Sequence, residues 1–232
     1  TYRTQAIAAR SFALYQHDTF GKTHQYDLGS TQASQVYGGY DGETDKSRAA
    51  AQDTWGKVLV TGPAGAERSF LTQYSSTCGG TVNGAIVIRE AADIEPLRGG
   101  QLCTDCGQSP TYRWPAARVA KSAIYRGVAD TYPRQSRVLG GGVKSVRVKD
   151  RTPYGRMMWV EIVGTSGKSI TIRGEDLRLA ILRVGGDSGN KLYSMNCDIR
   201  DAGSSVEFYN GKGFGHGVGL CQWGAQGKAR RG

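Results

Sequence analysis

The sequence predicts an α+β fold, and three observations lead to that prediction. The chain opens with a helical pattern, continues through short strands separated by glycine-rich turns, and contains a three-strand meander in its second half. With 34 glycines and 6 prolines in 232 residues, the composition is typical of many tight turns rather than long helices. A hydrophobic content of 38% and a charged content of 22% indicate a globular chain with a substantial core.

Two helices and a hairpin are predicted in the first third of the chain. Apolar residues recur at helical spacing from Thr4 to Lys22, and the segment 44–56 predicts a second helix that ends at its glycine. Residues 57–61 and 69–75 have the pattern of strands on either side of a glycine turn, which predicts a hairpin. Farther along, Pro115 is expected in the first turn of another helix.

The second half of the chain is richer in strands. Alternating apolar residues predict three strands, at residues 143–148, 158–162 and 170–172. The sequence GEDLRLAIL, at residues 174–182, predicts a short helix after them. We therefore expect residues 1–110 and 206–232 to form one mixed lobe, with residues 111–205 inserted as a β-rich lobe.

The net charge of +10 favours an anionic partner, such as an acidic polymer of the cell wall. Basic residues are scattered rather than clustered in runs, so nucleic acid is not an expected partner. The sequence has no apolar run long enough for a membrane span. The chain opens at Thr1, within a helical pattern, so we expect its natural start to have been removed, and any membrane attachment to depend on that removed segment.

Alternate glycines surround His216 near the end of the chain. The spacing fits neither dinucleotide-binding nor P-loop glycine patterns, which excludes a phosphate cradle. Two interpretations stay open. The glycines let the main chain approach a ligand or another strand, with His216, Gln222 and Trp223 lining a sugar-binding surface, or they form a buried turn around a structural histidine.

Cysteines form the second candidate site. Cys103 and Cys106 are spaced as C-x-x-C, and with Cys78 they offer three ligands of the kind that zinc prefers. A disulfide from Cys78 to one of the pair, or free thiols, are the alternatives. Cys78 as a nucleophile with His216 as its base is a weaker interpretation, because nothing in the sequence brings them together.

Four segments, QAIAARSFAL, YDLGSTQASQVYGG, YSSTCGGTV and GHGVGLCQWGAQGKA, together resemble the SpoIID/LytB family of sporulation proteins and amidase enhancers. The resemblance implies a two-lobed α+β fold with the active cleft between the lobes. It also implies an extracytoplasmic lytic transglycosylase that cuts peptidoglycan glycan strands already stripped of stem peptides. The alternative within the family is a non-catalytic protein that binds the wall and stimulates an N-acetylmuramoyl-L-alanine amidase.

By the resemblance, one glutamate protonates the glycosidic oxygen and then takes the proton of the muramic 6-hydroxyl, which closes a 1,6-anhydro ring. The family pattern places this glutamate before Thr1, so no residue of this chain is assigned as catalytic and the chain alone is expected to be inactive. No cofactor is expected for catalysis, and structural zinc is expected at the three cysteines. Several family members have a histidine where this chain has Ser75, which leaves a fourth ligand unassigned.

The matching positions are expected to contact glycan. They are Gln5, Arg10, Ser11, Ser30, Gln35, Tyr37, Ser75, Gly79, Gly80, Thr81, His216, Gly217, Gln222 and Trp223. The expected partners are peptidoglycan strands and, in the alternative, a cell-wall amidase.

Overall fold

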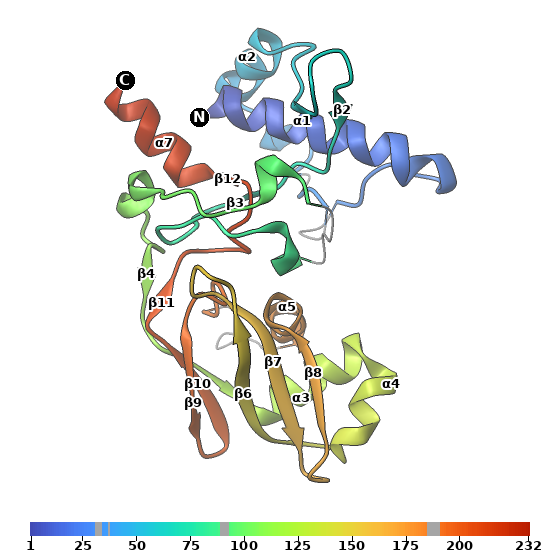
Figure 1. The fold of residues 1–232 in the computed structure, drawn as a ribbon, viewed down its shortest axis with the longest axis vertical. Coiled ribbons are helices and arrows are strands. Elements are labelled where there is room, and N and C mark those ends of the chain that lie inside the picture. The colour runs from blue at the N-terminus through green and yellow to red at the C-terminus, as the bar shows by residue number, and fades with distance from the viewer. Residues whose placement is uncertain (31–33, 37, 89–92, 185–190) are drawn as a thin grey trace.

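The computed structural model describes residues 1–30, 34–36, 38–88, 93–184 and 191–232. It is a mixed α+β structure with several small sheets, so the predicted fold class is confirmed. Helices α1, α2 and α7 lie at one end of the molecule, and the larger sheets lie with α3, α4 and α5 at the other (Figure 1). The predicted division into two lobes with a cleft between them stays a prediction.

The N-terminal end is built on two packed helices, both predicted. Helix α1 spans Tyr2–Thr19 and contacts α2, Asp45–Asp53. Thr44 caps α2, because its side chain accepts the Ser47 N–H while the Ser47 hydroxyl accepts the Thr44 N–H. Short 3₁₀ turns complete the connections, at Gly21–Thr23, Tyr40–Gly42, Ala85–Ile88, Glu95–Leu97, Thr104–Gln108 and Arg137–Leu139.

The strands that the structure describes at this end are each two residues long. The predicted hairpin is present as β1, Val60–Thr61, paired antiparallel with β2, Arg68–Ser69. The predicted strand 69–75 is wrong as one element, because the chain leaves β2 and pairs again only at β3, Tyr74–Ser75. The partner of β3 is β12, Leu220–Cys221, in a parallel pair.

The other end contains two three-stranded antiparallel sheets. The predicted meander is present as β6, β7 and β8, and the second sheet has the order β5-β10-β9. The strands of these sheets span Val143–Arg151 (β6), Met157–Gly164 (β7), Ser169–Arg173 (β8), Ala117–Ala120 (β5), Asp198–Ala202 (β9) and Ser205–Tyr209 (β10). β4, Arg113–Trp114, and β11, Gly211–Lys212, form a two-stranded ribbon. In the chain, β4 precedes β5 and β11 follows β10.

Among the described residues, three helices accompany these sheets: α3, Lys121–Thr131, α4, Pro133–Ser136, and α5, Gly174–Val184. Helix α5 confirms the prediction for GEDLRLAIL. Pro115 was expected in the first turn of a helix, and this expectation was wrong. Pro115 lies in the link between β4 and β5, and the next helix begins only at Lys121.

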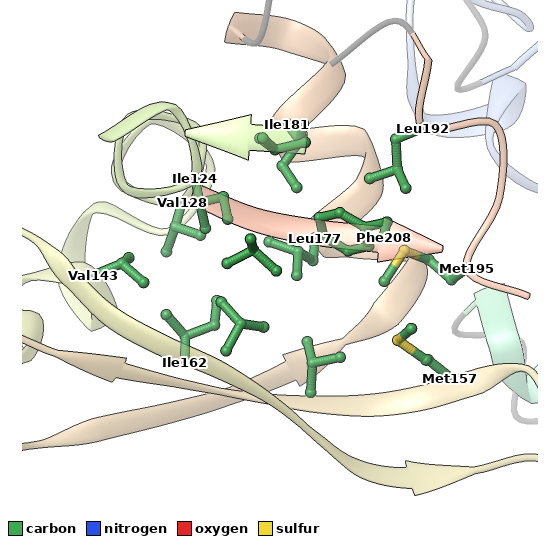
Figure 2. Packing of buried hydrophobic residues seen from close by; sticks show 14 of the residues in the cluster. Ile124, Val128, Val143, Met157, Ile162, Leu177, Ile181, Leu192, Met195 and Phe208 are labelled. Atoms are coloured by element: carbon green, nitrogen blue, oxygen red, sulfur yellow. The ribbon is translucent and has the colours of Figure 1, made fainter. Parts of the chain in front are cut away.

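The main hydrophobic core fills the space between these elements. Side chains from α3, α5 and β10 point toward those of β6 and β7 (Figure 2). Phe208 of β10 lies near the centre and is fully buried. Within the described residues, no helix is both long and apolar enough to cross a bilayer.

Candidate functional site

Segments from both ends of the chain meet beside the N-terminus of α1. The hydroxyl of Thr1 donates to Oε1 of Gln226 at 2.8 Å, and Nε2 of Gln222 donates to Oε1 of Gln5 at 3.0 Å. Gln222 and Gln226 lie on α7, Gln222–Arg231, a helix that the sequence analysis missed. The first and last of the four quoted segments are therefore neighbours in space.

The tail glycines bring main chain against main chain. At Gly219, a Cβ atom would lie 2.1 Å from the carbonyl oxygen of Gln73, and the backbone φ is +68°. Both facts require glycine at this position. The neighbouring Leu220 N–H donates to the same carbonyl at 2.9 Å, and the Phe214 N–H donates to the carbonyl of Thr77 at 2.8 Å. The structure thus contains a close approach to another strand of the protein, and the sugar-binding surface of the first interpretation stays a prediction.

His216 is held by the backbone. Its Nδ1 accepts the Val218 N–H at 3.1 Å, so the proton of the neutral ring resides on Nε2. Burial lowers the pKa of His216 to about 4, although the nearby Glu175 carboxylate opposes that shift. The imidazole is therefore neutral near neutral pH and has a structural bond to its own turn.

A buried group of charges lies close to this histidine. Glu175 and Arg178 on α5 are both buried and share three hydrogen bonds of 2.5 to 3.1 Å. Burial alone would raise the pKa of Glu175, but Arg178 and the nearby Arg156 together lower it. Sequence analysis missed this group, although Glu175 and Arg178 have the i, i+3 spacing of a helical ion pair.

Arg156, directly before β7, is fully buried. Its Nη1 donates to the carbonyl of Gly215 at 3.0 Å, which ties the tail to the larger sheet. The other two guanidinium nitrogens have no hydrogen-bond partner among the described residues. Burial lowers the pKa of Arg156 to about 10, so the side chain is still charged at neutral pH.

Four cysteines converge in the cysteine cluster, which we define as Cys78, Cys103, Cys106 and Cys221. All four are buried, and their Sγ atoms lie within 4.8 Å of one another. Cys78 and Cys106 are 3.7 Å apart, far beyond the S–S bond length of about 2 Å, and all of these thiols are free. The structure adds Cys221 to the three predicted ligands. No spacing rule could have found it, because it lies 143 positions from Cys78.

The surroundings of the cluster suit thiolate ligands. The sulfur of Cys221 accepts the N–H of Cys78 at 3.4 Å and of Gly224 at 3.3 Å, and so caps α7. Backbone donors of this kind orient and stabilise metal-bound thiolates. Contacts with Cys103 lower the pKa of Cys106 and Cys221, whereas contacts within the same cluster raise the pKa of Cys78 and Cys103. Four sulfurs around a zinc ion are separated by about 3.8 Å when Zn–S bonds are about 2.3 Å, and the measured 3.7 Å fits that geometry.

A hollow of about 760 Å³ adjoins the cluster. The first turns of α1, residues 96–103 and one face of α7 form its walls, and Cys103 and Cys221 contribute to its lining. The lining is mostly apolar, with Phe70, Leu102 and Leu220 among its side chains. No Asp, Glu or His is among the described residues that line it.

Comparisons with known proteins point to one family. Residues 1–60 match the family described as SpoIID, stage II sporulation protein. The resemblance to the SpoIID family is confirmed. An uncharacterized protein of Brachyspira hyodysenteriae is 25% identical over 242 residues, covering 98% of this chain and 55% of its own length. The amidase enhancer of Bacillus subtilis is 24% identical over 267 residues, covering 99% of this chain and 35% of its own. The chain thus spans about half or less of these relatives, and the SpoIID match indicates a role connected with the cell wall.

Several SpoIID-matching residues have structural contacts. The Arg10 guanidinium donates to main-chain carbonyls of Ala51, Thr54 and Lys57, at the C-terminal end of α2. The hydroxyl of Ser11 accepts the Leu59 N–H at 2.7 Å. These contacts join α1 to the segment after α2, and a glycan contact by either residue stays a prediction.

The second SpoIID segment lies partly against α1. Gln35 donates from Nε2 to the carbonyl of Ala9 at 2.9 Å, and Ser30 is exposed. Tyr37 lies outside the described residues.

The third segment forms the turn over the cysteine cluster. Gly79 and Gly80 both have positive φ, and Gly79 packs against the main chain of the tail. Thr81 bridges to Leu102, and the Ser75 hydroxyl is buried without a partner in the described structure.

In the fourth segment, Gly217 packs against the guanidinium of Arg156. Trp223 packs on the cysteine cluster, and its main-chain N–H donates to the carbonyl of Ser76 at 3.0 Å. The third and fourth segments are therefore joined around the thiols.

Proposed function

We propose that this chain binds peptidoglycan glycan and forms part of an extracytoplasmic lytic transglycosylase. The observation that supports the proposal best is the convergence of motif segments around one hollow of about 760 Å³, beside α1 and α7. Residues as far apart in the sequence as Ala8, Val82 and Lys228 line it, and they come from three of the four segments. The SpoIID match at residues 1–60 supplies the link to the cell wall.

In the proposed reaction, a carboxylic acid protonates the glycosidic oxygen after muramic acid, and the carboxylate then takes the proton of the 6-hydroxyl. The sugar oxygen closes onto its own anomeric carbon, so no water is consumed. The described lining of the hollow contains no carboxylate, and the family pattern places the acid before Thr1. In this proposal, the chain contributes the walls of the site and a longer protein contributes the acid.

The test uses glycan strands freed of stem peptides. The 232-residue chain should bind these strands without cutting them. A protein extended upstream, if it carries the family glutamate, should release fragments that end in 1,6-anhydro-muramic acid, identified by mass spectrometry. Ordinary reducing ends, or cleavage by the 232-residue chain itself, would contradict the proposal.

We also propose that the cysteine cluster holds structural zinc. Four thiolates supply a complete tetrahedral set, which leaves no open position for a substrate. Such a site would fasten residues 78–106 to the start of α7. Elemental analysis of freshly reduced protein should find about one zinc per chain, and less than about half an equivalent would refute the site.

A second function is favoured by the relative named amidase enhancer. In this alternative, the chain binds the wall and stimulates a separate N-acetylmuramoyl-L-alanine amidase. The two functions separate in one assay, in which a purified amidase digests intact peptidoglycan with and without the chain. A faster release of stem peptides, without any 1,6-anhydro ends from the extended protein, would favour the enhancer.

A further inference from the structure

Two like charges face each other across the ribbon of β4 and β11. Arg113 and Lys212 are direct cross-strand partners in this antiparallel pair. Directly opposed cations repel each other and destabilise a strand pair unless an anion lies between them. Within the described structure, neither side chain has an ion-pair or hydrogen-bond partner. The ribbon thus brings together two cations without a visible counterion.

The ribbon is nevertheless firmly held on its other side. Trp114 is buried, and its indole N–H donates to the carbonyl of Gly213 at 3.0 Å. The Lys212 N–H donates to the carbonyl of Asn196 at 2.9 Å, and the Lys212 carbonyl accepts the hydroxyl of Ser194 at 2.6 Å. Because the backbone is fixed, the two cations stay opposed.

A polar hollow of about 480 Å³ lies in front of these cations. We call it the ribbon pocket, and it is also lined by Arg151, Tyr154, Asn196, Asp198 and Asn210. Its lining shares no residue with that of the larger hollow beside α1. It therefore needs its own explanation.

Asp198, the single carboxylate among the described residues of the ribbon pocket, is already engaged. Asp198 accepts hydrogen bonds from Arg151 at 2.8 Å and from Asn210 at 3.0 Å. Arg151 also donates to the carbonyls of Gly155 and Cys197, so three of its five N–H donors are used within the protein and its charge is paired with Asp198. The charges of Arg113 and Lys212 are left over, and they favour an anionic ligand.

Asn210 is held in an unusual conformation beside these charges. Its φ is +54°, and it is the one non-glycine residue with positive φ in the described part of the chain. Asparagine tolerates this region better than most residues, and such positions are often found at functional sites. Here the conformation accompanies a bond from its side-chain amide to Asp198 in the ribbon pocket.

From this geometry we propose that the ribbon pocket binds an acidic sugar of the wall glycan, with the sugar carboxylate between Arg113 and Lys212. Amide groups of Asn196 and Asn210 suit the hydroxyl and N-acetyl groups of a pyranose, and the ring of Tyr154 offers a flat surface to its C–H groups. The inference rests on the proposed function, because it takes glycan as the ligand. The proposed contact would select glycan strands whose muramic carboxylates are free.

The test compares two double variants with the same change in net charge. Arg113→Gln with Lys212→Gln removes the two opposed cations, whereas Lys144→Gln with Arg147→Gln removes two exposed cations from β6. Binding to peptide-free glycan strands is measured by calorimetry, and circular dichroism checks that both variants are folded. The first variant should bind about tenfold more weakly than wild type, and the second should bind like wild type.

A second substrate isolates the carboxylate. When the muramic carboxylates are converted to methylamides, the wild type and the Arg113/Lys212 variant should bind equally well. If both double variants bind unmodified strands alike, the ribbon-pocket assignment is overturned while glycan binding itself stands. If the wild type binds no glycan, both proposals fall. Binding to polyglycerol phosphate is measured in parallel. If the Arg113/Lys212 variant binds polyglycerol phosphate more weakly than wild type but binds glycan strands equally well, the ligand is a phosphodiester and the acidic-sugar assignment is wrong.

Discussion

The sheet end of the molecule and the α1/α7 end use different means of stabilisation. Twenty buried residues form one continuous hydrophobic cluster between the sheets and helices at the sheet end. At the α1/α7 end, ten of the described buried hydrophobic residues form two clusters of five, and one of these contains the four thiols. The strands follow the same division, with up to nine residues at the sheet end and two at the other.

The difference shows where a bound metal ion would add most to stability. Burial of apolar surface contributes about 25 cal/mol per Å², so a large continuous core stabilises the sheet end without further help. Small clusters and two-residue strands at the α1/α7 end bury much less. A zinc ion in the cysteine cluster would compensate by joining two distant segments of the chain.

The largest expected effect comes from breaking the cysteine cluster. Cys106→Ser should abolish zinc binding and destabilise the α1/α7 end by about 4 kcal/mol or more. Hydrogen exchange followed by mass spectrometry should show faster exchange over residues 74–108 and 218–231, with protection kept over β6, β7 and β8. Cys197→Ser, at a buried cysteine outside the cluster, should retain zinc and show no such regional loss. Equal hydrogen exchange in the two variants would contradict the proposal that the cysteine cluster stabilises the α1/α7 end.

The next effect tests the sheet end. Phe208→Ala should lower the free energy of unfolding of this end by about 3–5 kcal/mol, because it leaves a cavity in a close-packed core. Urea unfolding measures the loss. Phe214→Ala, at a ring that is 39% exposed, should cost less than about 1 kcal/mol. Similar losses for both phenylalanines would mean that the sheet end does not depend on its core.

A smaller effect tests the backbone contact between β3 and β12. Gly219→Ala combines a positive φ with a clash against the Gln73 carbonyl, and should cost about 2–3 kcal/mol. Gly56→Ala is the matched control, since its φ is +73° and nothing lies within 4 Å of the added methyl group. Its cost should be only about 1 kcal/mol. Thermal unfolding of both variants separates close approach from backbone strain alone.

The last effect concerns pH, because it appears only when His216 takes up a proton. His216 has a folded-state pKa of about 4, below the ordinary value of 6.5, so the unfolded chain binds its proton more readily. The contribution of neutral His216 to the free energy of unfolding is fully present above pH 6.5, and it is lost as the pH falls toward about 4. In His216→Asn, the melting temperature should fall less over this range, since asparagine still accepts the Val218 N–H and takes up no proton. His24→Asn, at an exposed histidine, should keep the wild-type fall, and identical slopes for all three proteins would contradict the assignment.

Sequence patterns predicted the helices and strands in which apolar residues repeat at a regular spacing. They missed the elements that depend on partners far away in the sequence. Helix α1 and the meander repeat apolar residues often enough to be recognised. A two-residue strand such as β12 has no period, and Cys221 reaches the other thiols only because β12 pairs with β3. The unpaired nitrogens of Arg156 likewise depend on tertiary burial, which the local sequence does not encode.

The parallel pairing of β3 with β12 also sets the order in which the molecule can be assembled. Residues 74–75 have no strand partner until residues 220–221 have been synthesised, and Cys78 lacks its most distant neighbour until then. The sheet end draws its core from residues 114–208 and is complete earlier. Because domains fold as their chain emerges, the sheet end is expected to fold first. The α1/α7 end then closes last, and its thiols stay accessible to oxidants and metal ions until the final helix arrives.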